Sequence, residues 1–240
     1  MRQSEPKNVI KKLKGGLIVS CQQPPNSPLS PPGIIAAMVA VAEQQGAVGA
    51  RVNGAKNIRA ARRASGIPII GIEKLHVAGS SVYITPTWES VRRVCKAGAA
   101  IVALDCTRRR RPEDQSLAEI LRRAKNELGA IIMADVATLK EGVAAAELGV
   151  DVISTTLCGY TREARHCAGP AFELLAELVR RVAVPVVLEG RVHSPDDLRK
   201  GFDLGAHAVV VGAAITDVGW LARQFAQAAP RPTKRLLKNV

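Results

Sequence analysis

Residues 184–195 read VPVVLEGRVHSP, and the fold can be predicted from the pattern in this stretch. The apolar run 186–188 is rich in β-branched residues, which indicates a short buried strand of a parallel sheet. The run ends at Glu189, and the closing Ser-Pro is typical of the beginning of a helix. A carboxylate at the end of a buried strand is costly unless it has a partner. Glu189 is therefore either a functional group or the ordinary ion-pair partner of Arg191.

The same unit, an apolar strand followed by a helix, recurs along the whole chain. Glycines close several helices just before the next strand, as in Asp203-Leu204-Gly205. The predicted strands are 16–21, 47–52, 68–72, 100–104, 131–134, 152–156, 186–188 and 208–211. The predicted helices are 34–45, 55–65, 87–96, 116–129, 138–149, 171–182, 194–204 and 219–228.

Eight such units in 240 residues predict an α/β fold, a closed (β/α)8 TIM barrel in a single domain. The competing interpretation is a doubly wound open sheet, which uses fewer strands and a glycine-rich loop after its first strand. Here the glycine-rich turns follow the last two strands, so the barrel is favoured. We expect residues 1–15 to form a basic N-terminal segment, 16–229 the catalytic barrel and 230–240 a basic tail, with 75–85 as an insertion.

Composition narrows the classes of partner. The net charge is +13, but aromatic residues make up only 3% and no nucleic-acid-binding motif is visible, so we expect no nucleic-acid partner. The arginine run 108–111 is either a loop before a helix or part of an anion site. No segment is long and apolar enough to predict a membrane span. The five cysteines show no CxxC spacing, which favours a reduced, cytoplasmic protein without a zinc site.

Polar residues follow the predicted strands at equivalent positions. In a barrel the carboxyl ends of the strands share one face, so side chains just past each strand converge there. Each of them alone has a structural explanation, such as a surface ion pair or the capping of a turn, but their shared position favours a site. The residues concerned are Gln22, Arg51, Lys74, Asp105, Asp135, Thr155, Glu189 and Gly212.

The turns after the last two strands indicate a phosphate site. They contain Gly190-Arg191 and Gly212-Ala213, and small residues there let main-chain N–H groups approach an anion. We expect these four residues to bind the phosphate of a small phosphorylated substrate. The structural alternative is that the glycines only form tight turns.

Seven segments of the chain together resemble the N-acetylmannosamine-6-phosphate 2-epimerases, the NanE family. They are GLIVSCQ (16–22), ARVNG (50–54), GIEK (71–74), MADVAT (133–138), STTLCGYT (154–161), LEGR (188–191) and VVVGAAIT (209–216). The resemblance runs in order from about residue 16 to residue 225. It implies epimerisation at C2 of N-acetylmannosamine 6-phosphate to N-acetylglucosamine 6-phosphate in bacterial sialic-acid catabolism, without metal or cofactor. A homodimer is one assembly compatible with it.

The residues make chemical sense of that reaction. Inverting a carbon beside a carbonyl requires removal of a proton and its return on the other face. A desolvated Lys74 is the candidate base, and Glu189 either orients it or delivers the second proton. Arg51 and Asp135 are expected to bind the opened sugar and steady charge at O1. The expected set of substrate-binding residues also includes Gln22, Thr155, Gly159 and Tyr160.

Two positions depart from the family pattern. An ITRP-like string commonly follows the last glycine turn, with an arginine at the phosphate, but here Asp217 stands after Ile215-Thr216. Arg191 or the run 108–111 is then needed to supply the cation. The string 75–77 also differs from the basic and aromatic one expected. Two alternatives stay open: another phosphosugar barrel, which would need His and Asp metal ligands at strand ends, and a barrel that has lost catalysis and binds anions.

Overall fold

Eight parallel strands close into a barrel in the computed structural model, which describes residues 6–164 and 169–230. Neighbouring strands pair in sequence order, and β8 pairs with β1 to close the ring. The predicted (β/α)8 barrel is confirmed. The strands are β1 (Gly16–Cys21), β2 (Gly49–Asn53), β3 (Ile69–Ile72), β4 (Ile101–Asp105), β5 (Ile132–Asp135), β6 (Val152–Ser154), β7 (Val186–Glu189) and β8 (Ala208–Val211).

Alternate strand residues face two different apolar layers. In β3, Ile70 and Ile72 belong to the cluster that fills the barrel, whereas Ile69 packs with the helices outside. Because both faces of each strand are covered, the strands are apolar along their whole length rather than alternating with polar residues. Gly71 shows how close the outer layer lies, since a Cβ there would meet the Ala99 Cβ at 2.6 Å.

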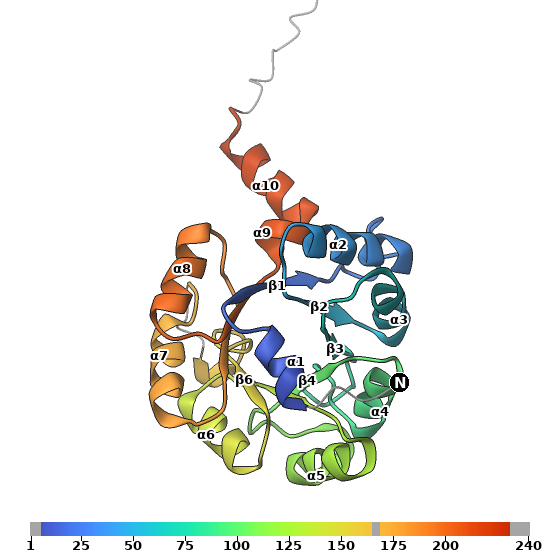
Figure 1. Ribbon diagram of the computed structural model, residues 1–240, viewed down its shortest axis with the longest axis vertical. Helices are drawn as coiled ribbons and strands as arrows, with labels where there is room; N and C mark the ends of the chain where they lie inside the picture. Colours follow the sequence, from blue (N-terminus) through green and yellow to red (C-terminus); the bar gives the residue numbers. More distant parts are fainter. Residues whose placement is uncertain (1–5, 165–168, 231–240) are drawn as a thin grey trace, which may run out of the picture.

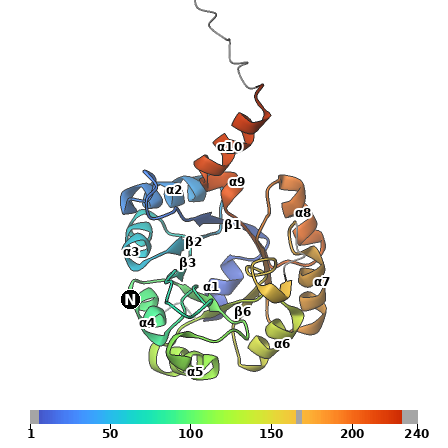
Figure 2. The same ribbon diagram turned by 180° about the vertical axis from the view of Figure 1, so that it is seen from behind.

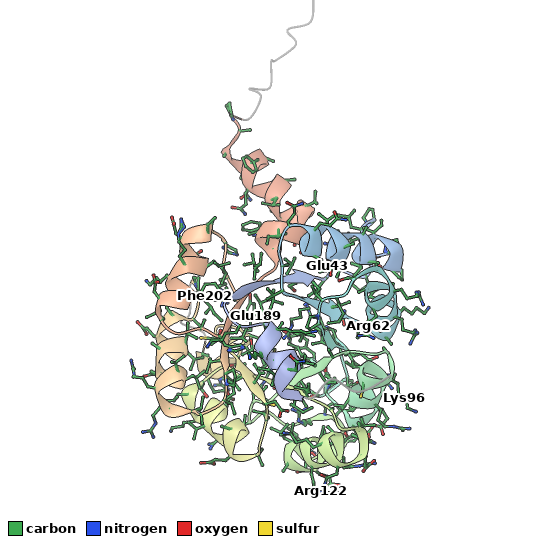
Figure 3. All side chains as sticks on the ribbon, in the orientation of Figure 1. Glu43, Arg62, Lys96, Arg122, Glu189 and Phe202 are labelled. Atoms are coloured by element: carbon green, nitrogen blue, oxygen red, sulfur yellow. The ribbon has the colours of Figure 1, made fainter. Side chains whose placement is uncertain are left out.

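A ring of helices covers the outside of the barrel, as Figures 1 and 2 show from opposite sides. Several begin at side-chain caps, and Thr138 forms a capping box with Glu141. Figure 3 shows Arg62, Lys96 and Arg122 on this outer ring, with Glu189 near the centre. The helices of the ring are α2 (Pro32–Gln44), α3 (Ala55–Ala64), α4 (Trp88–Lys96), α5 (Leu117–Leu128), α6 (Leu139–Glu147), α7 (Phe172–Arg181) and α8 (Pro195–Asp203).

The N-terminal segment has a structural role that the sequence did not predict. Helix α1 (Pro6–Lys12) lies across one end of the barrel in Figure 1. Val9 and Leu13 pack into the cluster inside the barrel, and Leu13 is 0% exposed. The backbone carbonyl of Ile10 also lies 2.9 Å from Nε2 of His207. The expected basic N-terminal segment is therefore part of the packed fold over residues 6–14, because two apolar side chains spaced by four close the bottom of the barrel.

The chain after β8 leaves the ring. Helix α9 (Ala213–Thr216) follows the last strand directly, and α10 (Val218–Ala228) projects away from the barrel in Figures 1 and 2. Two short 3-10 helices, Pro112–Asp114 and Arg162–Ala164, lie in the loops after β4 and β6. No helix in the described part of the chain is long and apolar enough to cross a membrane. Residues 231–240 of the expected basic tail lie outside the described residues.

Candidate active site

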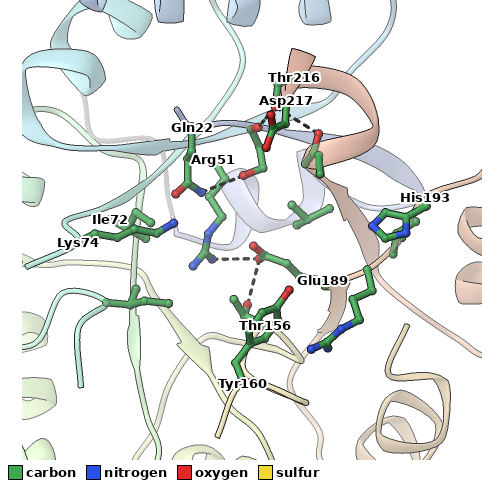
Figure 4. Close-up of a pocket in the computed structure, with 18 of the residues that line it drawn as sticks. Gln22, Arg51, Ile72, Lys74, Thr156, Tyr160, Glu189, His193, Thr216 and Asp217 are labelled. Atoms are coloured by element: carbon green, nitrogen blue, oxygen red, sulfur yellow. Dashed lines mark hydrogen bonds and ion pairs between the residues drawn. The ribbon is translucent and has the colours of Figure 1, made fainter. Parts of the chain in front are cut away.

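A pocket of about 310 Å³ opens at the carboxyl ends of the strands. It combines charged groups, two tyrosines and the glycine turns after β7 and β8. Its lining residues are Ser20, Gln22, Arg51, Ile72, Lys74, Tyr83, Ile84, Thr156, Tyr160, Glu189, Gly190, Arg191, Val192, His193, Val210, Gly212, Ala213, Thr216 and Asp217. Figure 4 shows side chains converging from several strands, among them Arg51 on β2, Lys74 after β3 and Glu189 on β7.

A buried guanidinium holds two carboxylates at the floor of this pocket. Arg51 on β2 is only 1% exposed, and its Nη1 and Nη2 donate to Asp135 Oδ1 at 3.1 Å and Oδ2 at 2.5 Å. Arg51 Nη1 also lies 3.1 Å from Glu189 Oε2. The bidentate contact fixes the plane of the guanidinium, so Arg51 is rigidly oriented toward Glu189.

The charges in this cluster shift the pKa values of its members. Burial lowers the pKa of Arg51, but the two carboxylates raise it by more, so that Arg51 stays charged. Burial raises the pKa of Glu189, only partly offset by Arg51, and repulsion from Asp135 raises it further. Two carboxylates share one guanidinium here. Glu189, which has the single contact, is therefore the group able to take up a proton.

Lys74 enters the pocket from the side opposite Glu189. Its backbone N–H donates to Asn53 Oδ1 at 2.8 Å, which fixes the chain just after β3. In Figure 4 its side chain points toward the Arg51 guanidinium, with Glu189 beyond. Burial lowers the pKa of the Lys74 amine, and the neighbouring Arg51 charge lowers it further. A larger fraction of Lys74 than of an ordinary lysine is therefore neutral.

The expectation that Thr155, after β6, binds the substrate is not supported by the position of its side chain. Thr155 is fully buried, and its hydroxyl bonds to the backbone N–H and C=O of Glu189, both at 3.0 Å. The next residue, Thr156, faces the pocket instead, with its Oγ1 2.8 Å from Asp135 Oδ1 and 3.0 Å from Glu189 Oε2. Val152 packs inside the barrel and Ile153 outside it, and the same alternation continued past Ser154 turns Thr155 outward and Thr156 into the pocket.

Asp135 and Asp105 are also placed differently from the expectation. Asp135 does not line the pocket and contacts Arg51 and Thr156, so it acts on the pocket through them. Asp105 is fully buried and pairs with Arg109 at 2.5 Å and with Thr107. The arginine run 108–111 lines a separate pocket between the β4 loop and α6, so none of it supplies a cation to this site.

Arg191 is turned toward the loop after β6. Its Nη1 donates to the carbonyl of Cys158 at 2.8 Å and its Nη2 to that of Gly159 at 3.1 Å. The guanidinium also stacks 4.2 Å over the Tyr160 ring. Gly159 has a φ of +80°, and a Cβ there would collide with the guanidinium, so Gly159 supports this contact without lining the pocket. Arg191 is not the partner of Glu189 that the sequence left open.

The far end of the pocket is built from small residues. Gly190, Gly212 and Ala213 line it as expected. Thr216 closes the turn by donating to the backbone carbonyl of Ser20 at 2.7 Å. Gln22 lies alongside, with its Nε2 2.9 Å from Ser20 Oγ and its Oε1 buried without a partner among the described residues.

Among the pocket residues that the strand-end rule missed are Tyr83, Thr156 and His193. Tyr83 comes from the insertion after β3, where Ile84 forms an antiparallel bridge with Lys74 and the Tyr83 ring stacks on His76 at 5.3 Å. Thr156 lay one residue beyond the predicted position, and His193 follows the glycine turn. Only the adjacency of Thr156 to a chosen threonine offered a signal for it. In the part of the chain that the structure describes, no three His, Cys, Asp or Glu side chains group to hold a metal ion.

Comparison with known proteins gives a consistent result. A family model described as "Putative N-acetylmannosamine-6-phosphate epimerase" matches residues 35–231. A curated protein of Cutibacterium acnes named "Putative N-acetylmannosamine-6-phosphate 2-epimerase" is 45% identical over 218 residues, covering 88% of this chain and 94% of that protein. A protein of the same name from Caldanaerobacter subterraneus is 45% identical over 219 residues, covering 91% and 92% of the two chains.

Solved structures agree in fold. The N-acetylmannosamine-6-phosphate 2-epimerase of Clostridium perfringens superposes with a TM-score of 0.89 at 39% identity, covering 92% of this chain and 96% of that chain. Thiamine phosphate pyrophosphorylase of Pyrococcus furiosus superposes with a TM-score of 0.58 at 18% identity, which shows a shared fold alone.

Proposed function

The chain belongs to the N-acetylmannosamine-6-phosphate epimerase family, and from that premise we propose that it converts N-acetylmannosamine 6-phosphate to N-acetylglucosamine 6-phosphate by proton transfer at C2. One observation carries the proposal for these residues. The Lys74 amine and the Glu189 carboxyl enter one pocket from opposite sides, above a buried arginine. A base and an acid on opposite sides of one carbon can remove a proton from one face and return a proton to the other.

Lys74 acts as the base. Its pKa is lowered by burial and by the Arg51 charge, so the neutral amine is available to take the C2 proton of the opened sugar. The C2–H bond breaks, its electron pair moves into the C1–C2 bond, and O1 of the aldehyde becomes an enolate oxygen. Arg51, fixed by Asp135, is the nearby permanent positive charge that stabilises this oxygen.

Glu189 acts as the acid. Burial raises its pKa, and its protonated form gives a proton to C2 from the other face as the carbonyl re-forms. Thr156 orients the carboxyl through its 3.0 Å contact with Oε2. The product has the opposite configuration at C2, and one further proton exchange between Glu189 and Lys74 through solvent resets the site.

The remaining lining residues bind the sugar. Gln22 offers an unpartnered Oε1, and Tyr160 offers a hydroxyl at the pocket, so both are suited to substrate hydroxyls or the acetamido group. The small residues Gly190, Gly212 and Ala213 leave room for the 6-phosphate at the far end. Arg191 supports this site by holding the loop that carries Tyr160.

A Lys74→Met variant tests the assignment of the base. Met keeps the length of the side chain and removes the amine, so we expect the epimerase rate to fall at least about a hundredfold, the range for loss of a general base. Lys140→Met on the exposed surface of α6 is the matched control and keeps the wild-type rate. A Lys74→Met variant with the wild-type rate would exclude Lys74 as the base.

We also propose that the protein acts as a homodimer through α10. This helix buries none of its eleven residues, yet it carries Val218, 55% exposed, and Phe225, 76% exposed. Beside it, an apolar groove runs between α2 and α9, lined by Met38, Val41 and Ile215 among others. A helix this short needs packing to be stable, and a second copy of the chain would supply it.

Sedimentation velocity tests the dimer. We expect the wild-type protein to sediment as a dimer, and Phe225→Glu to shift it toward monomer because a carboxylate replaces an apolar contact. A wild-type protein that stays monomeric at tens of micromolar would exclude this assembly. We further propose a cytoplasmic location, supported by Cys21, Cys95 and Cys106, which are free thiols.

A further inference from the structure

The proposed reaction places a phosphate dianion in the pocket, so the positively charged side chains that line the pocket are candidates for binding it. Four lining side chains within the described residues can carry one, namely Arg51, Lys74, Arg191 and His193. The Arg51 guanidinium is held by Asp135 and Glu189, and Lys74 is needed without its proton. Two candidates remain for the phosphate, Arg191 and His193.

The Arg191 guanidinium is already engaged. Both of its terminal nitrogens donate to backbone carbonyls of the loop after β6, at 2.8 and 3.1 Å, and its face covers the Tyr160 ring. Turning it toward a phosphate would break two hydrogen bonds and leave the two carbonyls without these donors. Arg191 is therefore a loop-holding residue here.

The His193 ring, unlike the Arg191 guanidinium, is not engaged in hydrogen bonds with the part of the chain that the structure describes. It lines the pocket three residues after Gly190, and its ring nitrogens have no hydrogen bond to any side chain or backbone group of the described residues. The ring packs against Trp220 of α10, with centroids 4.7 Å apart and planes tilted by 33°. This contact limits the orientations of the otherwise exposed imidazole, and a ring N–H is available to a ligand. Its backbone N–H is held separately, by Asp197 Oδ2 at 3.0 Å.

Asp217 adds a negative charge to the same end of the pocket. It lines the pocket beside Thr216, and its Oδ1 accepts the Trp220 backbone N–H at 2.8 Å, which caps α10. The carboxylate thus serves the helix that carries the stacking partner of His193, while its charge repels a phosphate.

We propose that His193 is a phosphate-binding residue of this site, that its imidazole donates to the phosphoryl group of the sugar, and that Asp217 weakens this binding by charge repulsion. The inference rests on the proposed function, because it assumes a 6-phosphate lying between the turns at Gly190 and Gly212. It assigns to His193 an effect on binding and none on the chemistry at C2.

Three variants test the inference by steady-state kinetics with N-acetylmannosamine 6-phosphate. His193→Phe keeps a ring to stack on Trp220 and removes the donor, so KM should rise about tenfold with kcat within about twofold of wild type, as expected for a lost hydrogen bond to a charged group. His193→Gln keeps an N–H donor and should raise KM less than about threefold. Asp217→Asn keeps an N-cap residue without the charge and should lower KM about threefold.

Calorimetric binding of the same sugar with and without its phosphate separates this inference from the proposed function. We expect His193→Phe to weaken binding of the 6-phosphate about tenfold, the value expected for the lost donor, and to leave the unphosphorylated sugar unaffected. If His193→Phe weakened the binding of both sugars equally, or kept the wild-type KM and affinity, the role of His193 would be overturned. Wild-type protein that binds the 6-phosphate without epimerising it would overturn the proposed function alone. No binding of the 6-phosphate would overturn both.

Discussion

Removal of the Arg51 guanidinium should cost a large part of the free energy of unfolding. In Arg51→Met, Asp135 loses both of its bonds to the guanidinium, at 3.1 and 2.5 Å, and keeps Thr156 among its partners, while Glu189 loses its cation at 3.1 Å. Breaking a buried ion pair from one side costs about 3–5 kcal/mol, because a charge is left uncompensated. Domains are typically stable by about 5–15 kcal/mol, so the variant should fold with much of its margin lost.

Urea denaturation at pH 7, followed by circular dichroism, measures this loss against a matched control. Arg93 pairs with Glu73 at 2.7 Å on the surface and is 47% exposed, so Arg93→Met should cost less than about 1 kcal/mol. Adding Asp135→Asn to Arg51→Met should restore part of the stability, because one stranded charge is removed. If Arg51→Met is no less stable than Arg93→Met, the buried contacts of Arg51 with Asp135 and Glu189 do not stabilise the fold.

Further predictions concern pH, packing and orientation. The pKa of Glu189 is raised in the folded protein, so its protonated form contributes to stability fully below the unfolded pKa near 4.5, and this contribution is lost as pH rises. Glu189→Gln does not lose it, so the stability of this variant relative to wild type should increase above that pH. Urea midpoints measure the difference. Because the pKa of Lys74 is lowered from 10.5, its amine should be acetylated faster at pH 8 than that of Lys140. Mass spectrometry of the peptides measures the ratio of the two acetylation rates, and equal rates would contradict the lowered pKa. Leu13→Ala should cost about 2–5 kcal/mol by leaving a cavity under the barrel, as urea midpoints would show, and a loss below about 0.5 kcal/mol would contradict the role of the N-terminal segment in closing the barrel. Thr156→Val should lower kcat about tenfold with little change in KM, since one hydrogen bond that orients Glu189 is lost.

The alternation of strands and helices could be predicted from the sequence, because each buried parallel strand is one short apolar run. The structure reproduces 16–21 and 208–211 and moves the other strands by one or two residues. The polar residue that follows each run was a good guide to Arg51, Lys74 and Glu189, whose side chains do meet at one end of the barrel.

The same rule could not decide which way a side chain points. Strand β6 was expected to end at residue 156 but ends at Ser154, and of the two threonines that follow, Thr156 faces the pocket, because alternate residues face opposite sides. Asp105 follows the rule in sequence but turns to Arg109, a contact made by a loop with no pattern of its own. Arg191 was assigned to phosphate because its charge was visible, whereas the carbonyls it binds were not.

Incubation of N-acetylmannosamine 6-phosphate with the protein in D₂O, followed by proton NMR, tests the central claim most directly. Removal of the C2 proton by Lys74 and return of another by Glu189 predicts that N-acetylglucosamine 6-phosphate appears with deuterium at C2. Product that keeps the original proton at C2, or no conversion at all, would contradict the account.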